Sequence, residues 1–238
     1  MAEKYLSIAK EIFEQFPAYV RGVVLAFDVQ NGESPEEIRR MLRDVERFIR
    51  EEFSDIETIE HPKIASWREA YRSAGMKPGK YRPSIEAMVR RINKNIELPS
   101  INSLVDIGNI ISLRNLVPVG GHAIDVVEGN IELRPANGDE EFIAFGSNEM
   151  EYPNPGEIIY VECNTILTRR WTWRQANHTS TQITTDSIEI NIDGLPPVTE
   201  SNIREICEET SQMVRQYCGG ETRYELLTKR HPRMMLNR

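Results

Sequence analysis

Two segments carry the residues best suited to chemistry, and the first runs from Pro99 to Asp125. Its apolar residues recur at helical spacing before Pro118 and two glycines, which predicts a helix, a turn and then a loop. Asp106 and Asn109 are three residues apart and therefore share one side of that helix. Polar groups on a mostly apolar helix need partners, so both are candidates for contacts with a substrate.

The loop of this segment holds a histidine next to main-chain amides. His122 directly follows Gly120 and Gly121, and Asp125 comes shortly after it. A histidine in this place can orient a water molecule or bind a substrate, while the glycine amides can stabilise a developing oxyanion. The alternative is a hydrogen-bonded structural histidine.

The second segment, Thr168 to Gln175, combines arginines with tryptophans. In a strand, Trp171 and Trp173 would share a face, and in a turn Arg170 and Arg174 could converge on one anion. Either arrangement would suit a phosphate or a nucleoside. The alternative is a pair of core tryptophans with the arginines extending outward.

Charge is distributed unevenly along the chain, whose net charge is −8. Residues 66–95 hold eight basic and two acidic side chains, a local charge of +6, and residues 223–238 carry a local +4. Aromatic residues are interleaved with the first basic segment, as expected of a surface that binds phosphates and stacks bases. The alternative is a solvated helix face. The candidate RNA-binding residues are Arg68, Arg72, Lys77, Lys80, Arg82, Arg90 and Arg91.

Several classes of protein find no support in the sequence. It shows no phosphate-binding loop, paired catalytic carboxylates, metal-ligand cluster or Ser-His-Asp arrangement, so we expect neither a metal nor a cofactor. Three cysteines, Cys163, Cys207 and Cys218, suggest buried thiols rather than disulfides. No apolar run approaches the roughly 18 residues of a membrane span, and the first residues do not resemble a secretion signal. We therefore expect a cytoplasmic protein that does not bind membranes.

The first part of the chain is expected to be mostly helical, with one strand. Amphipathic spacing predicts a helix over 4–16, and a β-branched, aromatic run predicts a buried strand over 19–29. Ser34 is expected to cap a helix that ends near Phe53. Two further helices are predicted over 62–74 and 84–96.

The second part is expected to be a β region followed by a helix. Residues 130–135 and 141–145 flank Asn137-Gly138, a strong hairpin signal. Further strands are predicted over 156–163 and 182–192, and a helix over 200–217. No repeat or linker divides the chain, so residues 1–238 are interpreted as a single α+β domain.

Three ordered motifs resemble the free-standing members of the B3/B4 domain family, named after a module of the phenylalanyl-tRNA synthetase beta subunit. They are WREAYRSAGMKPGKYRPSIEAMVRR, LPSINSLVDIGNIISLRNLVPVGGHAID and LTRRWTWRQ. The resemblance covers about residues 19–194, with the N-terminal helix and the helix over 200–217 packed on that core. It implies an α+β fold with two layers of strand and one of helix, a charged tRNA as partner and an editing-type pocket for an amino-acid moiety. Neither DNA binding nor aminoacylation is expected.

The resemblance also implies roles for single residues. Asp106, Asn109, His122 and Asp125 match the pocket motif of the synthetase module. The chain departs from that module at Gly108, where the synthetase usually has a threonine, and in the slightly longer loop before His122. Its Arg169–Gln175 segment replaces a glycine-rich stretch, and the position of the editing glutamate falls near Asn191.

Two functions therefore remain open. The first is hydrolysis, in trans, of wrongly charged aminoacyl-tRNA, with His122 as the catalytic candidate and no metal or covalent nucleophile. The second is a non-catalytic module that binds tRNA or an amino acid in the same pocket. In both, the candidate substrate-binding residues are Asp106, Asn109, Gly120, Gly121, Asp125, Arg170, Trp171, Trp173, Arg174 and Gln175.

Overall fold

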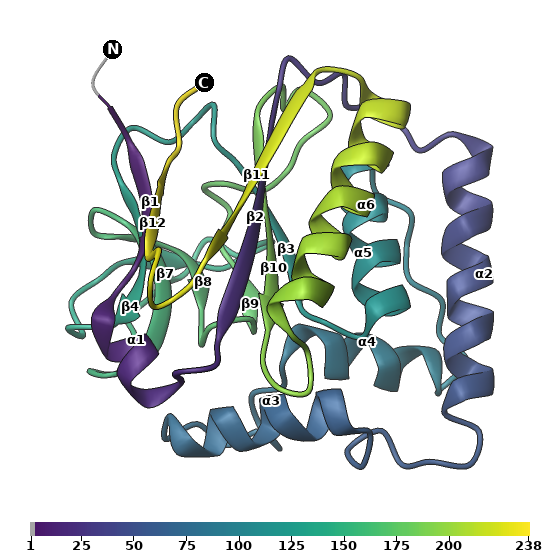
Figure 1. Cartoon of the computed structure of the whole chain (residues 1–238), viewed down its shortest axis with the longest axis horizontal. Helices are drawn as coiled ribbons and strands as arrows, with labels where there is room; N and C mark the ends of the chain where they lie inside the picture. Colours follow the sequence, from purple (N-terminus) through teal and green to yellow (C-terminus); the bar gives the residue numbers. More distant parts are fainter. Residues whose placement is uncertain (1–2) are drawn as a thin grey trace.

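The computed structural model describes residues 3–238 and arranges them in three layers (Figure 1). A six-stranded sheet forms one outer layer and a four-stranded sheet the middle layer. Helices α2, α5 and α6 cover the other face of the four-stranded sheet. This arrangement confirms the predicted α+β class with its β/β/α layers.

The bounds of the elements are as follows. The helices are α1 (Lys10–Gln15), α2 (Glu36–Glu52), α3 (Pro62–Ser73), α4 (Ser84–Ile92), α5 (Ser103–Asn115) and α6 (Glu200–Cys218). The six-stranded sheet comprises, in order, β12 (Arg233–Met235), β1 (Tyr5–Ile8), β4 (Ile131–Pro135), β7 (Ile158–Glu162), β8 (Thr165–Arg169) and β9 (Arg174–Gln175). The four-stranded sheet comprises β11 (Glu221–Leu227), β2 (Val20–Phe27), β10 (Ile188–Gly194) and β3 (Val119–Ala123), while β5 (Phe142–Ile143) and β6 (Met150–Glu151) pair separately.

Strand β10 shows why the middle sheet has two different faces. Its isoleucines Ile188, Ile190 and Ile192 belong to the apolar core formed with the helices. Side chains alternate along a strand, so Glu189, Asn191 and Asp193 face the six-stranded sheet instead, and all three are buried. A row of polar residues is thereby placed between the two sheets.

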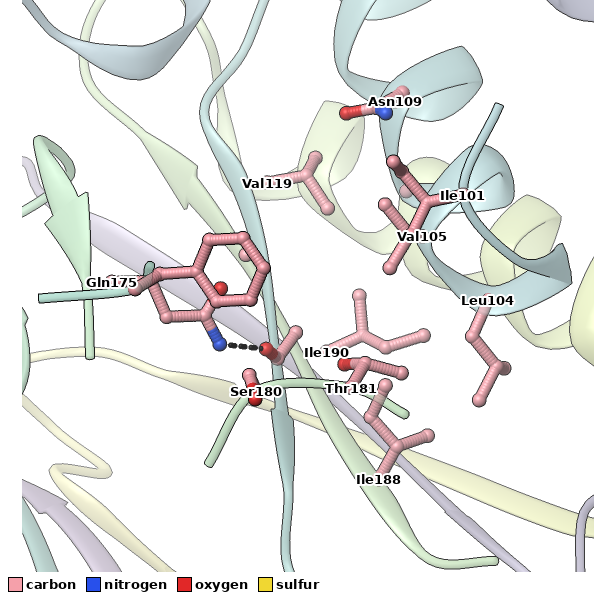
Figure 2. A pocket seen from close by; sticks show the side chains of 14 residues that line it. Ile101, Leu104, Val105, Asn109, Val119, Gln175, Ser180, Thr181, Ile188 and Ile190 are labelled. Carbon is pink, nitrogen blue, oxygen red and sulfur yellow. Dashed lines mark hydrogen bonds between the residues drawn. The ribbon is translucent and has the colours of Figure 1, made fainter. Parts of the chain in front are cut away.

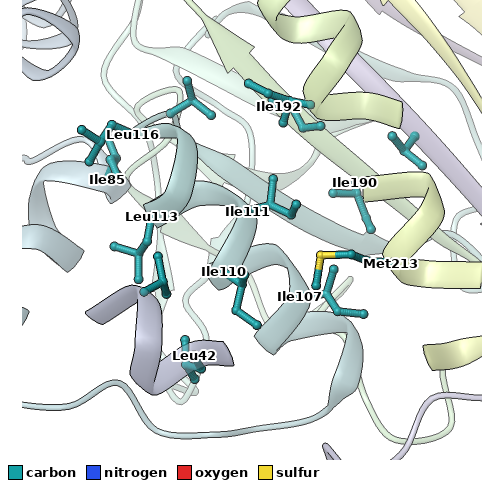
Figure 3. Packing of buried hydrophobic residues seen from close by; sticks show 14 of the residues in the cluster. Leu42, Ile85, Ile107, Ile110, Ile111, Leu113, Leu116, Ile190, Ile192 and Met213 are labelled. Atoms are coloured by element: carbon teal, nitrogen blue, oxygen red, sulfur yellow. The ribbon is translucent and has the colours of Figure 1, made fainter. Parts of the chain in front are cut away.

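Helix α5 is the central element of the helical layer. Ile107, Ile110 and Ile111 are fully buried and pack against residues of α2, α6 and β10 (Figure 3). A helix that is apolar on several sides is expected to be enclosed by other elements. Asn102 caps it, accepting a hydrogen bond from the Val105 main-chain N–H at 3.0 Å. This enclosure fixes α5 beside β3, where the candidate site lies.

The predicted N-terminal helix is wrong in its first half. Residues Tyr5–Ile8 form β1, which pairs in parallel with β4 and antiparallel with β12, and α1 begins only at Lys10. Leu6 and Ile8 are buried while Tyr5 and Ser7 are partly exposed, a period-two pattern. Pairing with distant strands therefore decides the conformation of a segment whose apolar spacing also fits a helix.

Other helix boundaries differ for local reasons. Ser34 does not cap α2, because Pro35 is the N-cap residue and the Ser34 hydroxyl donates to Asp106 instead. Helix α4 ends at Ile92 rather than near Ile96, and Asn95 then adopts a positive φ of 57°. Helices α3 and α6 confirm the predictions to within a residue or two.

The predicted hairpin around Asn137-Gly138 is wrong. Strand β4 pairs with β1 and β7, whereas β5 pairs with β6. The Glu140 carboxylate closes the turn by accepting from the main-chain N–H groups of Asn137 and Gly138 at 2.9 and 3.0 Å. A turn signal thus correctly marks a turn, but the flanking strands find other partners.

Three further differences concern the β region and the thiols. The expected loop around His122 is strand β3, and β10 begins at Ile188 instead of Gln182. Strands β11 and β12 were not predicted, and they extend the two sheets beside β2 and β1. Cys207 and Cys218 are buried as expected, but Cys163 is exposed.

Candidate functional site

The candidate site is built around β3, which lies at the edge of the four-stranded sheet. In its register with β10, Gly120 lies opposite Asn191 and His122 lies opposite Glu189. Side-chain alternation places His122 on the face toward the six-stranded sheet and Val119 on the face toward α5. The strand therefore separates two cavities, one on each face.

The cavity on the helix side is apolar and has a volume of about 230 Å³. Figure 2 shows aliphatic side chains from α5, β3 and β10 converging on it, with Thr181 and Gln175 at its polar side. None of its lining residues is charged. The lining comprises Ile101, Leu104, Val105, Gly108, Asn109, Val119, Gly120, Gly121, Phe145, Gln175, Ser180, Thr181, Ile188 and Ile190.

The cavity between the two sheets is smaller and polar, with a volume of about 130 Å³. It shares Val119, Gly120 and Gln175 with the apolar cavity, so the two adjoin around the edge of β3. Its lining comprises Ser84, Pro118, Val119, Gly120, His122, Thr168, Trp171, Thr172, Trp173, Arg174, Gln175, Asn191 and Asp193.

His122 is buried in this polar cavity, and both of its ring nitrogens have hydroxyl partners. Nδ1 lies 2.7 Å from Thr179 Oγ1 and Nε2 lies 3.2 Å from Thr168 Oγ1. Burial, with smaller electrostatic effects of Arg21 and His178, lowers the pKa of His122 to about 3. The imidazole is therefore neutral near pH 7, and it is better suited to orienting a hydroxyl or a water than to transferring protons.

Glu189 is the acidic residue that sequence reasoning missed. It is fully buried opposite His122, and Asn191 Nδ2 donates to Glu189 Oε2 at 3.3 Å. Burial raises the pKa of Glu189 to about 7, although Arg21, Asn191 and Tyr160 act in the opposite direction. Tyr160 is close enough to have this effect, but neither its hydroxyl nor Glu189 Oε1 makes a hydrogen bond of good geometry. The alternating IEINID pattern of β10 was the signal that could have revealed this residue.

We expect Glu189→Gln to stabilise the fold at alkaline pH. The raised pKa means that the folded protein keeps a proton that the unfolded chain releases between pH 4.5 and about 7. The stabilisation from this proton is complete below pH 4.5 and is lost as the pH rises through 7. Glutamine has no such loss, so the variant should exceed wild type by on the order of 3 kcal/mol at pH 8.

Urea unfolding of both proteins at pH 5 and pH 8 measures this effect. The lowered pKa of His122 acts with the opposite sign, because the unfolded chain binds its proton as the pH falls below 6.5. That contribution is common to both proteins and cancels in their difference. An equal difference in unfolding free energy at the two pH values would contradict the assignment.

The outer edge of β3 presents a free main-chain donor. Asp193 N donates to Pro118 O, which places Pro118, Gly120 and His122 in the hydrogen-bonded pairs with β10. The main-chain N–H and C=O of Gly121 therefore point away from β10. The Gly121 carbonyl accepts a hydrogen bond from Gln175 Nε2 at 2.6 Å (Figure 2). Within residues 3–238, the Gly121 N–H has no acceptor. Of the two predicted oxyanion donors, Gly121 is available and Gly120 is not.

The structure separates the two predicted tryptophans. Residues 170–173 form a turn in which Arg170 and Trp171 have positive φ values of 47° and 65°. Trp171 is buried in the core and stacks edge-on against Trp67, although one part of it reaches the polar cavity. Trp173 instead lies partly exposed at the rim of that cavity. The segment is therefore a turn at these residues rather than the strand in which the two tryptophans would have shared a face.

The predicted arginines also have partners within the chain. Arg170 Nη2 lies 3.0 Å from Glu157, and Arg174 Nη1 lies 3.2 Å from Glu151. Arg169, which was not singled out, bridges both glutamates at 2.8 and 2.7 Å. The arginines thus converge on carboxylates of the protein, and only Arg174 lines the polar cavity.

The two predicted aspartates lie outside both cavities. Asp106 is fully buried and accepts from the hydroxyls of Ser34 and Ser100 and from the Ile101 main-chain N–H, at 2.6, 2.5 and 3.0 Å. It therefore anchors the segment before α5 rather than a substrate. Asp125 is exposed in the turn after β3, while Asn109 does line the apolar cavity.

The basic segment 66–95 presents only part of its charge to solvent. Arg68 Nη1 donates to both carboxylate oxygens of the buried Glu86, at 2.7 and 2.8 Å. Arg90 Nε lies 2.8 Å from Oε1 of the same carboxylate. Arg72 pairs with Glu69. Lys77, Lys80 and Arg82 are exposed in the turn that connects α3 to α4, and Arg91, also exposed, donates to the Glu97 carbonyl.

The fold and the site together define an α+β protein with two cavities around a glycine-rich edge strand. A model of the B3/4 domain family matches residues 66–219, and the chain belongs to this family. Among solved structures, it is similar to an N-terminal fragment of the phenylalanyl-tRNA synthetase beta-subunit from Pyrococcus horikoshii, with 10% identity and a TM-score of 0.45. That similarity covers 92% of this chain and 50% of the fragment, so the chain spans half of the fragment's length. No curated protein matches it.

Residues 3–238 offer neither a metal-ligand cluster nor a membrane-spanning helix. No group of three or more His, Cys, Asp or Glu side chains in this part of the chain is placed to hold a metal ion. None of its helices has the length and apolar character needed to cross a membrane.

Proposed function

We propose that this protein binds charged tRNA and hydrolyses the aminoacyl ester, with the ester held against the edge of β3. The observation that carries this proposal is the free Gly121 N–H between an apolar and a polar cavity. The ester carbonyl would lie against this amide, the amino-acid side chain in the apolar cavity and the terminal ribose toward the polar cavity. Membership of the B3/4 domain family supports an RNA substrate.

The reaction needs few protein groups. A water attacks the carbonyl carbon, and the Gly121 N–H donates to the oxyanion that forms. The ribose 3′ oxygen leaves with the electron pair of the broken C–O bond and takes up the proton lost by the water, with help from the neighbouring ribose hydroxyl. His122 and Thr168, which both line the polar cavity, would orient the water. The products are the free amino acid and tRNA with a free 3′ hydroxyl.

The lining of the apolar cavity supports an uncharged, apolar amino-acid side chain. A cavity of 150 Å³ can hold a benzene-sized group, so about 230 Å³ has room for a leucine or phenylalanine side chain. A charged side chain would lose its hydration without finding a partner there.

We expect Gly108→Leu to lower the hydrolysis of substrates that carry a bulky apolar amino acid. A Cβ at Gly108 would lie 3.8 Å from Val119 Cγ1, an ordinary contact, and Gly108 lines the cavity, so a larger side chain at this position would occupy part of it. Hydrolysis of phenylalanyl- and leucyl-tRNA should fall by about 10- to 100-fold in kcat/KM, while that of alanyl-tRNA stays nearly constant. Gly108→Ala is the matched control, and an equal loss for all three substrates would contradict the placement.

One observation favours the second candidate, a binding module without hydrolysis. The polar cavity contains no free base, because the pKa of His122 is lowered to about 3 and Asp193 is paired with Arg21 at 2.7 Å. A deacylation screen across tRNAs charged with different amino acids separates the two candidates. Release of one class of amino acid supports hydrolysis, whereas binding of charged tRNA without release supports the module.

A further inference from the structure

An alternating series of aromatic rings and guanidinium groups lies at the rim of the polar cavity. The Arg170 Cζ atom lies 3.7 Å from the centre of the Tyr81 ring and 4.7 Å from that of Trp173. Arg174 Cζ lies 5.0 Å from the centre of the Trp173 ring. The rings of Tyr81 and Trp173 contact each other edge-on, with 4.9 Å between their centres. These distances are typical of cation–π contacts.

Packing in the core and ion pairs with two glutamates hold this cluster in place. Trp171 anchors the turn by packing edge-on against Tyr19 and Trp67 in the core. Ion pairs with Glu157 and Glu151 fix the guanidinium groups of Arg170 and Arg174. Trp173 is consequently presented at the cavity rim with little conformational freedom left to lose on binding.

Positive charge is in excess around the cluster. Lys80 and Arg82 flank Tyr81 in the sequence, and both are exposed. The nearest acid to Arg82 is Glu86, whose carboxylate is 4.0 Å from Arg82 Nε and already binds Arg68 and Arg90. Three guanidinium groups thus share one carboxylate, which leaves Arg82 able to bind an anion.

We propose that this rim is a subsite for an unpaired 3′-terminal nucleotide of RNA, a proposal that rests on RNA being the ligand of the proposed function. The base packs on the Trp173–Arg174 pair, because unpaired bases stack on aromatic rings and on arginine planes. A phosphate group binds Arg82 and Lys80. The ribose then points toward the polar cavity, whose lining includes Ser84 and Asn191.

Binding of an RNA hairpin with a short unpaired 3′ overhang ending in adenosine, compared with the same hairpin made blunt-ended, tests the subsite. By fluorescence anisotropy, wild type should prefer the overhang by roughly 5- to 150-fold. Trp173→Ala should remove this preference and leave affinity for the blunt hairpin unchanged, whereas Trp173→Phe should keep most of it. Arg47→Ala is the control, because Arg47 is an exposed arginine outside the basic segment and pairs with Asp44.

One further readout uses wild type alone, and a second uses the conservative variant Trp173→Phe. An overhang whose terminal nucleotide lacks its base should bind wild type as weakly as the blunt hairpin does. The overhang should also quench tryptophan fluorescence in wild type but not in Trp173→Phe, since Trp67 and Trp171 are each only 1% exposed. Equal affinity of wild type for overhang and blunt hairpins, or a preference that survives both the base deletion and Trp173→Ala, would overturn the proposal.

These measurements are independent of catalysis. A protein that prefers the overhang but deacylates no charged tRNA retains the subsite and lacks the proposed hydrolysis. A protein that deacylates charged tRNA without distinguishing the two hairpins retains the proposed function and lacks the subsite.

Discussion

Replacing His122 with alanine is expected to lower the rate of deacylation by about 10²-fold, the size of a lost positioning effect, while tRNA affinity stays nearly constant. His122 is buried and lines the polar cavity, whereas the basic side chains that would bind phosphates are exposed. Its removal should therefore affect the positioning of water and Thr168 in the reaction rather than binding of the tRNA body. Single-turnover deacylation and a separate binding titration measure the two effects.

The pH profile of wild type provides a second measure of this role. With its pKa lowered to about 3, His122 is neutral from pH 5 to pH 8, so its titration contributes no inflection near pH 6.5. His122→Ala should consequently lower the rate by the same factor at pH 5 and at pH 8. A loss that grows toward one of these pH values would show instead that His122 transfers a proton.

A structural role for His122 predicts a different outcome. Loss of the imidazole leaves the Thr179 and Thr168 hydroxyls without their ring partner, which costs about 1–3 kcal/mol when such groups remain buried. Thr179→Val is the matched control, because Thr179 contacts His122 but does not line the polar cavity. If this control lowers stability and rate as much as His122→Ala does, the proposed role in orienting water is wrong.

Reversal of Lys77, Lys80 and Arg82 to glutamate should produce the largest loss of tRNA affinity. These are the exposed basic residues of the turn between α3 and α4, whose Tyr81 contacts Trp173 of the polar cavity. Each lost phosphate contact removes a released counterion, so the slope of log affinity against log salt should fall by about 0.7–0.9 per contact. Binding titrations at several salt concentrations measure this slope.

Arg90, another candidate RNA-binding residue, is left out of this charge reversal because of its contacts in the structure. Arg90 neutralises the buried Glu86, so its reversal would disturb folding as well as binding. The control is reversal of Arg39, Arg47 and Lys229, which are exposed outside this turn and give the same change in net charge. Equal losses of affinity in the two triple variants would show that only net charge matters and that the turn is not the RNA contact.

Sequence patterns were sufficient to predict those helices and strands whose conformation is favoured by their own residues. The helix starts predicted at residues 62 and 200 are those of α3 and α6, where the structure places Pro62 in the first turn and Thr199 at the N-cap. The β-branched run of β2 was likewise correctly assigned as a buried strand. In each of these elements, local propensity and tertiary burial favour the same conformation.

Patterns were insufficient where the outcome depends on a distant partner. The apolar residues of Tyr5–Ile8 fit a helix and a strand equally, and pairing with β4 and β12 decides for the strand. Trp171 and Trp173 are equivalent in sequence spacing, but a turn with positive φ values sends one into the core and leaves the other at the cavity rim. Asp106 likewise has its partners at Ser34 and Ser100, which no helical spacing could indicate.

The sequence alone determined that the chain contains a glycine-rich segment ending in a histidine, a basic segment with interleaved aromatic residues and the motifs of one α+β family. Only the tertiary structure decided that the glycine-rich segment is an edge strand, that two cavities of opposite polarity adjoin it and that Glu189 lies opposite His122. The physical reason is that residue type and spacing determine which way side chains point along one element. Burial, pKa and the shape of a cavity arise instead from elements that are far apart in the chain and meet only in the fold.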